Sequence, residues 1–106
     1  MTVHTEIEIA ELYQMLQQPD GNALVVDVRE PEEFVRGHLP GAVNWPLSSL
    51  AGRLSSLPRD RFLVLYSGRG RRSAEAWACL HAAGFSDICH LRGGLEAWRM
   101  SGLLVA

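Results

Sequence analysis

Short, uninterrupted apolar runs alternate with stretches of helical periodicity along the whole chain, and this alternation constrains the fold most. The two strongest runs span residues 24–26 and 62–66. Both are apolar at consecutive positions, which is typical of strands covered on both faces, as in a parallel sheet. Shorter runs that we expect to form strands lie at residues 7–9, 41–44 and 87–91.

The stretches between these runs carry the signals of helices. Residues 10–18 and 73–83 have apolar side chains at helical spacing, and Gly84 follows the second stretch, where a helix end favours glycine. Shorter helices are expected at residues 30–34 and 93–98. Alternating strands and helices predict a small α/β fold, with a central sheet of about five parallel strands flanked by helices on both faces.

Length and charge narrow the class of protein further. The 106 residues suit one domain, so we expect residues 1–106 to form a single unit. No apolar run approaches the roughly 18 residues of a membrane span, and the net charge of −2 gives no basic field for nucleic acid. All ten cations are arginines, which excludes Schiff-base chemistry on lysine. We therefore expect neither a nucleic-acid nor a membrane partner.

Cysteine and histidine usage gives no metal or disulfide signal. Cys79 and Cys89 are too few for a disulfide framework, and no spacing of Cys or His fits a zinc site. We therefore expect neither a metal nor a cofactor. The first residues lack the basic and apolar regions of a secretory signal, so a cytoplasmic location is the default expectation.

The segment between the strongest strand and the best helix is the candidate for chemistry. It begins at Ser67, ends before Ser73 and contains two glycines and three arginines, Gly68, Arg69, Gly70, Arg71 and Arg72. In open α/β sheets, ligands bind beyond the carboxyl ends of strands. Glycines allow consecutive N–H groups to converge, and a helix N-terminus adds partial positive charge. Such a loop should hold an anion or stabilise a thiolate at its first residue.

Three other interpretations of the segment are weaker. A dinucleotide fingerprint of the Gly-x-Gly-x-x-Gly type fails because Ser73 takes the place of the third glycine, and a P-loop fails because there is no lysine. A bland surface loop is the usual case for scattered arginines. However, Arg71 and Arg72 at a helix N-terminus oppose the helix dipole unless an anion or a nearby acid offsets them. This cost favours a functional loop.

Three motifs in order resemble the rhodanese-like family of single-domain sulfurtransferases, over nearly the whole chain. The first is Val-Asp-Val-Arg at residues 26–29, followed by Glu-Phe at 33–34 and by Gly-His-Leu-Pro-Gly-Ala at 37–42. The second is the strand, six-residue loop and helix around residues 67–72. The third is Leu-x-Gly-Gly-x-x-Ala-Trp at residues 91–98, with glycine at 102. The resemblance implies a rhodanese-like α/β fold and a sulfurtransferase site in the loop.

The resemblance places the family's nucleophilic cysteine at the position of Ser67. The rest of the loop matches, with Gly70 at the family's glycine, Arg72 at its closing basic residue and Ser73 at its hydroxyl. The loop amides would hold a persulfide, and the loop arginines would attract thiosulfate. Cys79 and Cys89 cannot replace the nucleophile, because one lies within the predicted helix and the other in the next strand. We expect both to be small core residues.

The family's reaction implies the partners and also the consequence of the serine. A thiolate accepts sulfane sulfur from thiosulfate or a persulfide donor and passes it to cyanide, a thiol or a protein acceptor. A serine hydroxyl is barely ionised without a strong adjacent base, and the loop offers only arginines. We therefore predict no sulfur transfer by this chain. Related phosphatases place their arginine six residues after the nucleophile, whereas Arg72 follows Ser67 by five, which disfavours that activity.

Residues outside the loop have mainly structural interpretations. Asp27 and Arg29, at the end of a buried strand, are expected to form an ion pair and cap a helix, with ligand contact as the alternative. His38 is expected to be a structural histidine. Trp77 and Trp98 should fill the core. Trp45 is expected either to pack in the protein or to line the mouth of the pocket. A solvated helix face is expected for Glu30, Glu32 and Glu33. No function is assigned to His4, His81 and His90.

Two hypotheses from different classes remain open. The first is a sulfurtransferase scaffold whose cysteine is replaced by Ser67, either by deliberate substitution or naturally. The second is a naturally non-catalytic rhodanese-like module that binds an anion or a protein. A domain normally fused to another protein, in which the loop has no role, is a third alternative.

Overall fold

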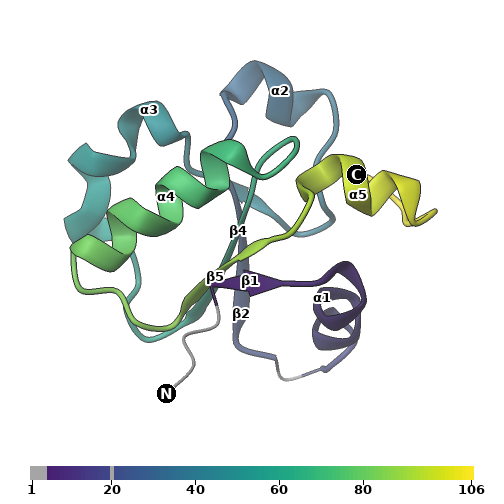
Figure 1. Cartoon of the computed structure of the whole chain (residues 1–106), viewed down its shortest axis with the longest axis horizontal. Coiled ribbons are helices and arrows are strands. Elements are labelled where there is room, and N and C mark those ends of the chain that lie inside the picture. Colours follow the sequence, from purple (N-terminus) through teal and green to yellow (C-terminus); the bar gives the residue numbers. More distant parts are fainter. Residues whose placement is uncertain (1–4, 20) are drawn as a thin grey trace.

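Five parallel strands form the centre of the computed structural model, which describes residues 5–19 and 21–106 (Figure 1). They are β1 (Glu6–Ile7), β2 (Ala23–Asp27), β3 (Val43–Asn44), β4 (Phe62–Tyr66) and β5 (Ile88–Leu91). Their order across the sheet is β1-β5-β4-β2-β3, and every neighbouring pair is parallel. The predicted parallel α/β sheet is confirmed, and the strongest apolar run, β4, is its central strand.

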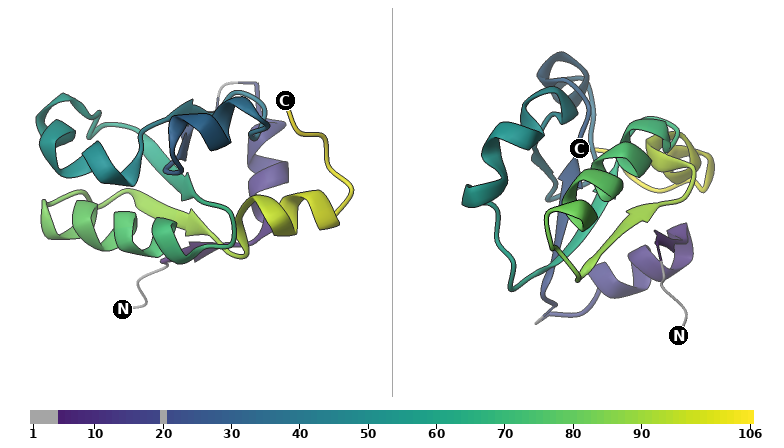
Figure 2. Two further views of the ribbon diagram at one scale, coloured as in Figure 1. Left: turned by 90° about the horizontal axis from the view of Figure 1, so that it is seen from above. Right: turned by 60° about the vertical axis from the view of Figure 1, so that its left-hand side comes forward.

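Helices lie on both faces of this sheet, as predicted (Figure 2). They are α1 (Ile9–Leu16), α2 (Pro31–Val35), α3 (Leu47–Leu50), the 3₁₀ helix η1 (Ala51–Ser56), α4 (Arg71–Ala82) and α5 (Gly94–Met100). One hydrophobic core joins the sheet to α1 and α5 through Leu12, Leu95 and Trp98. A second core joins the other face to α3 and α4 through Leu50, Ala76 and Leu80.

The central strand β4 serves both cores by the alternation of its side chains. Val64 and Tyr66 belong to the core under α1 and α5, whereas Leu63 and Leu65 belong to the core under α3 and α4. All four are fully buried. This arrangement explains why the run is apolar at every position: neither face of the strand meets solvent.

The helical segment over residues 47–56 was not predicted from the sequence. Two short helices, α3 and η1, occupy it, and Leu50 and Leu57 bury their side chains in the second core. Elements of four and six residues give little periodicity, and serine and glycine have weak helix propensity. The helical conformation of this segment is therefore explained by the packing of these leucines in the second core and not by the helix propensity of its residues.

Capping residues move several predicted boundaries. The first strand is Glu6–Ile7, because Glu8 and Glu11 form a capping box that starts α1 at Ile9. Helix α4 starts at Arg71, two residues earlier than predicted, after Gly70 in the left-handed conformation. Its other end matches the prediction: the amides of Gly84 and Phe85 donate to the carbonyls of His81 and Leu80, as in a Schellman motif.

The two cores account for the hydrophobic residues of all five strands.

Within residues 5–19 and 21–106, no helix has both the length and the apolar character needed to cross a lipid bilayer.

The core beneath α4 generates a stability prediction. Leu80→Ala should lower the free energy of unfolding by about 2–5 kcal/mol, because Leu80 is fully buried and its removal leaves a cavity. Leu104→Ala is the matched control, since this side chain is 84% exposed and should change stability by less than about 0.5 kcal/mol. Urea unfolding of both variants measures the difference. Equal effects would contradict the assignment of Leu80 to the core.

Candidate functional site

The loop of residues 67–72 leaves β4 at the carboxyl edge of the sheet and leads directly into α4 (Figure 1). Its start is fixed to the neighbouring strand, because the amide of Val28 donates to the carbonyl of Tyr66 at 3.0 Å. Gly70 has a φ of 107°, a left-handed conformation that suits glycine and turns the chain into the helix. The loop therefore lies where ligands bind in open α/β sheets.

The side chain of Ser67 lies at the centre of this loop and is 1% exposed. Its Oγ accepts hydrogen bonds from the amides of Gly70 and Ser73, both at 3.2 Å, and contacts the Oγ of Ser73 at 3.4 Å. Two converging N–H donors at a helix N-terminus stabilise negative charge on the atom that they face. The position of Ser67 therefore suits an anionic side-chain atom.

Further amides of the same loop are available to a ligand. Among the residues that the structure describes, the N–H groups of Gly68, Arg69, Arg71 and Arg72 have no hydrogen-bond acceptor. Backbone N–H groups gathered in a loop of this kind form an anion-binding concavity. The amide of Gly70 is not among them, because Ser67 occupies it. The Gly70 amide therefore faces the side-chain atom of residue 67, whereas the other four amides are open to a ligand.

The start of α5 supports the loop from behind. The amides of Leu95 and Glu96 donate to the carbonyls of Ser67 and Gly68, at 2.9 and 3.0 Å. Gly94 makes this approach possible, since a Cβ there would collide with the carbonyl oxygen of Ser67 and lie 2.8 Å from the carbonyl carbon of Gly68. A glycine at position 94, the first residue of α5, is therefore a steric requirement of the loop.

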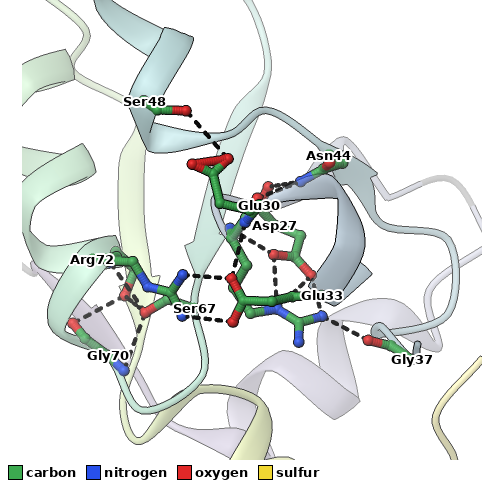
Figure 3. A network of polar contacts seen from close by, with 11 residues as sticks. Asp27, Glu30, Glu33, Gly37, Asn44, Ser48, Ser67, Gly70 and Arg72 are labelled. Carbon is green, nitrogen blue, oxygen red and sulfur yellow. Dashed lines mark hydrogen bonds and ion pairs between the residues drawn. The ribbon is translucent and has the colours of Figure 1, made fainter. Parts of the chain in front are cut away.

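Two of the three loop arginines are paired with acids. Arg72 forms a bidentate pair with Glu33 of α2, at 2.7 and 3.0 Å (Figure 3). Arg69 contacts Glu96 of α5 at 3.0 Å, with both side chains largely exposed. These acids offset much of the unfavourable interaction between the arginines and the helix dipole. The presence of arginines at this helix N-terminus is therefore weaker evidence for a bound anion than the sequence suggested.

Glu33 departs most from its predicted place on a solvated helix face. Its side chain is half-buried, and it also accepts the amide of Glu30 in a capping box that starts α2. The hydrogen bonds from Arg72 lower the pKa of the Glu33 carboxyl to about 2. The same pair raises the pKa of Arg72. Glu33 therefore links α2 to the loop and is not part of a solvated face.

Asp27 and Arg29 form the expected ion pair next to the loop. Their side chains meet at 2.7 Å in a buried position, and Arg29 also donates to the carbonyl of Gly37. Asn44 donates to the carbonyls of both residues at 2.9 Å. Neither Asp27 nor Arg29 caps a helix, so that part of the expectation is wrong: α2 is capped by Glu30.

A depression of about 380 Å³ lies beside the loop. It is lined by Arg29, Gly68, Arg69, Leu95, Glu96, Arg99 and Met100. The ion pair of Arg29 with Asp27 fixes one wall, and the exposed Met100 forms part of the rim. The volume lies within the range of small-molecule pockets, and three guanidinium groups line it.

One polar residue at the site was not assigned any role from the sequence. His90 of β5 is buried, and its Nδ1 lies 3.3 Å from the Oγ of Ser73. Its Nε2 lies 4.0 Å from the carboxylate of Glu6. Burial lowers the pKa of His90 and outweighs the opposing effect of Glu6. In the parallel sheet, His90 pairs with Leu65, which lies two residues before Ser67. This register brings His90 next to the loop although the two are far apart in the sequence.

The remaining residues singled out in the sequence are structural. Cys89 is buried in the first core, and burial raises the pKa of its thiol to about 12, while Cys79 packs half-buried on α4. His38 stacks on Phe34 and hydrogen-bonds to its carbonyl, as expected of a structural histidine.

Of the tryptophans, Trp98 fills the first core as predicted. Trp45 and Trp77 pack half-buried against the second core. His4 lies outside the described residues.

Comparisons with known proteins identify the family. A family model described as the rhodanese-like domain matches residues 8–101. A sulfurtransferase of Allochromatium vinosum is 38% identical over 92% of this chain and 91% of its own length. The thiosulfate sulfurtransferase GlpE of Pseudomonas aeruginosa is 36% identical over 81% of this chain and 78% of its own length. Other curated relatives are longer, and the chain spans 57% of one and 19% of another.

Solved structures agree with the sequence relatives. The crystal structure of a rhodanese-related protein from Thermoplasma volcanium superposes with a TM-score of 0.87 and 31% identity, covering 97% of this chain and 98% of that one. The fold and the site define a class of small α/β proteins that have a parallel sheet and a loop of converging N–H groups after its central strand. The chain belongs to the rhodanese-like domain family.

The contact between α5 and the loop gives a second prediction. Gly94→Ala should destabilise the protein by more than Gly102→Ala and shift the amide resonances of residues 67–72, because only the first methyl group meets the loop backbone. Both glycines have positive φ, so both variants carry about 1–2 kcal/mol of left-handed strain, and Gly102 has open space around it. Unfolding in urea and amide spectra test this. Equal losses of stability would show that the close approach is unimportant.

The pair between Glu33 and Arg72 gives a third prediction. Glu33→Gln removes the charge but keeps a side chain able to complete the capping box. At about pH 7 the variant should be less stable by about 0.5–1 kcal/mol, a modest value because both side chains are more than a third exposed.

The stability difference should shrink as the pH falls from about 4.5 towards about 2, since protonation of Glu33 then abolishes the pair. Glu32→Gln is the control on the same helix turn, and it should show a smaller and less pH-dependent change. Chemical unfolding at several pH values measures both variants. A difference that persists unchanged near pH 2 would contradict the account.

Proposed function

We propose that the chain is the scaffold of a sulfurtransferase site in which Ser67 occupies the position of the nucleophilic cysteine. The observation that carries the proposal is the geometry around the Ser67 Oγ, which receives two N–H donors at the N-terminus of α4. Membership of the rhodanese-like family and the sulfurtransferase relatives support it. A thiosulfate donor is supported by the name of the Pseudomonas aeruginosa relative.

The reaction needs a thiolate at position 67. The thiolate would attack the sulfane sulfur of thiosulfate, forming a new S–S bond while the old S–S bond breaks and sulfite leaves with its electron pair. Cyanide or a thiolate acceptor would then attack the outer sulfur and release the original thiolate. Helix N-termini and nearby cations favour a thiolate near neutral pH. A hydroxyl at the same place remains protonated, so we propose that the chain with Ser67 transfers no sulfur.

Each loop residue has a role in this proposal. The free amides of Gly68, Arg69, Arg71 and Arg72 would hold the outer sulfur or the oxygens of the donor, and Gly70 provides the turn. Arg71, exposed at the start of α4, and Arg69 would attract the donor anion. The pairs of Arg72 with Glu33 and of Arg29 with Asp27 would keep the walls rigid, and Ser73 would orient the side chain of residue 67.

The proposal treats residues 1–106 as a single domain, because one sheet joins elements from β1 to β5. The longer relatives, one of them named a probable adenylyltransferase/sulfurtransferase, indicate that such a domain also occurs within larger proteins. A thiol, cyanide or protein acceptor is equally compatible with the depression beside the loop.

A second candidate is a non-catalytic module that binds an anion or an acidic protein segment. The observation in its favour is that the Ser67 hydroxyl already satisfies the amides of Gly70 and Ser73, so the loop holds its shape without a thiol. The module would use the same free amides and arginines, without any covalent step.

Thiosulfate:cyanide sulfur transfer tests the first candidate. Ser67→Cys should turn over thiosulfate, while the native chain and the control Ser55→Cys should not, since Ser55 is exposed on η1. Ser67→Cys without any turnover of thiosulfate or of a persulfide donor, in a folded protein, would contradict the enzyme proposal. Thiosulfate-dependent shifts of the loop amides in the native chain would then favour the binding module.

A further inference from the structure

A continuous line of polar atoms runs from the loop into the sheet. It begins at the Oγ of Ser67, passes the Oγ of Ser73 at 3.4 Å, reaches the Nδ1 of His90 at a further 3.3 Å and ends at Glu6, 4.0 Å from the Nε2. These residues come from the loop, α4, β5 and β1. Ser67, Ser73 and His90 are all buried. The line is therefore shielded from water for most of its length.

The hydroxyl of Ser73 is placed to pass a proton along this line. Its single proton has two acceptors within reach, the carbonyl of Gly70 at 3.1 Å and the Nδ1 of His90 at 3.3 Å. With neutral His90, the hydroxyl can donate to the ring and accept from residue 67. With protonated His90, the ring donates to Ser73, whose proton turns to Gly70. The exchange needs rotation of one hydroxyl and no movement of heavy atoms.

Charges around His90 suit a proton acceptor. Desolvation lowers the pKa of the imidazole, so the ring is unprotonated near pH 7 although it is a weaker base than an exposed histidine. Among the described residues, Glu6 of β1 is the charged group that acts on His90, and its carboxylate favours the protonated ring. The side chain that contacts the ring from α4 is the hydroxyl of Ser73, and the hydroxyl of Ser67 lies one contact further away.

We propose that His90, acting through Ser73, is the proton acceptor for the side chain at position 67. When a thiol stands at that position, its proton passes to the Oγ of Ser73 while the Ser73 proton passes to the Nδ1 of His90. The products are a thiolate, which the amides of Gly70 and Ser73 hold, and an imidazolium facing Glu6. Atoms and charge balance without a further reactant. His90 touches no reacting atom, so it is a positioning residue for the site proposed above, on which this inference rests.

The relay would add a base from outside the loop, whose own charged residues are all arginines. The base lies outside the loop, in β5, and two contacts away. A hydroxyl at position 67 is too weakly acidic for the relay to ionise it, so Ser67 remains a hydrogen-bonding group. The relay becomes active only when a thiol is present.

The pH profile of thiol alkylation tests the relay. Iodoacetamide modification of the Ser67→Cys protein should report a thiol pKa below the ordinary value of about 8.5. Adding His90→Asn should raise that pKa by about 1, because the amide can keep a hydrogen bond to Ser73 but cannot take a proton. Adding Ser73→Ala should raise it similarly, and both changes together should not add, since they break the same line.

Controls separate the relay from folding and from the proposed function. The native chain corrects for alkylation of Cys79 and Cys89, and peptide mass spectrometry assigns the modified residue. Amide spectra show whether each variant keeps its fold. An unchanged thiol pKa in folded His90→Asn overturns the relay even if Ser67→Cys transfers sulfur. A raised pKa supports the relay even if Ser67→Cys transfers none, in which case only the proposed function fails.

Discussion

The close contact between the start of α5 and the loop of residues 67–72 determines the shape of the site. Two amides of α5 hold the carbonyls of Ser67 and Gly68, and the missing side chain of Gly94 allows that approach. Because these carbonyls point towards α5, N–H groups of the loop can point towards the interior of the loop. Those of Gly70 and Ser73 donate to the Oγ of Ser67. A concavity of N–H donors is the physical basis of anion binding, so the rest of the site depends on this contact.

Charge balance is the second feature on which the account depends. Arginines beside a helix N-terminus are unfavourable alone, and here Glu33 and Glu96 offset two of them. Both acids lie on other elements, α2 and α5, so the pairs also tie these helices to the loop. The buried pair of Asp27 and Arg29 adds a fixed wall on the adjoining strand. The charged side chains at the site therefore hold neighbouring elements together, in addition to any contact with a ligand.

Sequence reasoning predicted the features that depend on local pattern. The apolar runs of β2 and β4, the helix α4 with Gly84 at its end, and the pair of Asp27 with Arg29 can each be read from neighbouring residues. It missed Glu33 and His90, whose roles depend on partners 39 and 17 positions away. Nothing in the spacing of a single sequence connects such residues, because the sheet register and helix packing bring them together.

The central claim is that the site is complete apart from one sulfur atom. Mass spectrometry of the Ser67→Cys protein after incubation with thiosulfate, without any acceptor, tests it most directly. The account predicts that the peptide containing position 67 gains the mass of one sulfur atom, that a reducing thiol removes it, and that the native chain gains none. A folded Ser67→Cys protein that alkylates readily at position 67 yet never acquires the extra sulfur would contradict the claim.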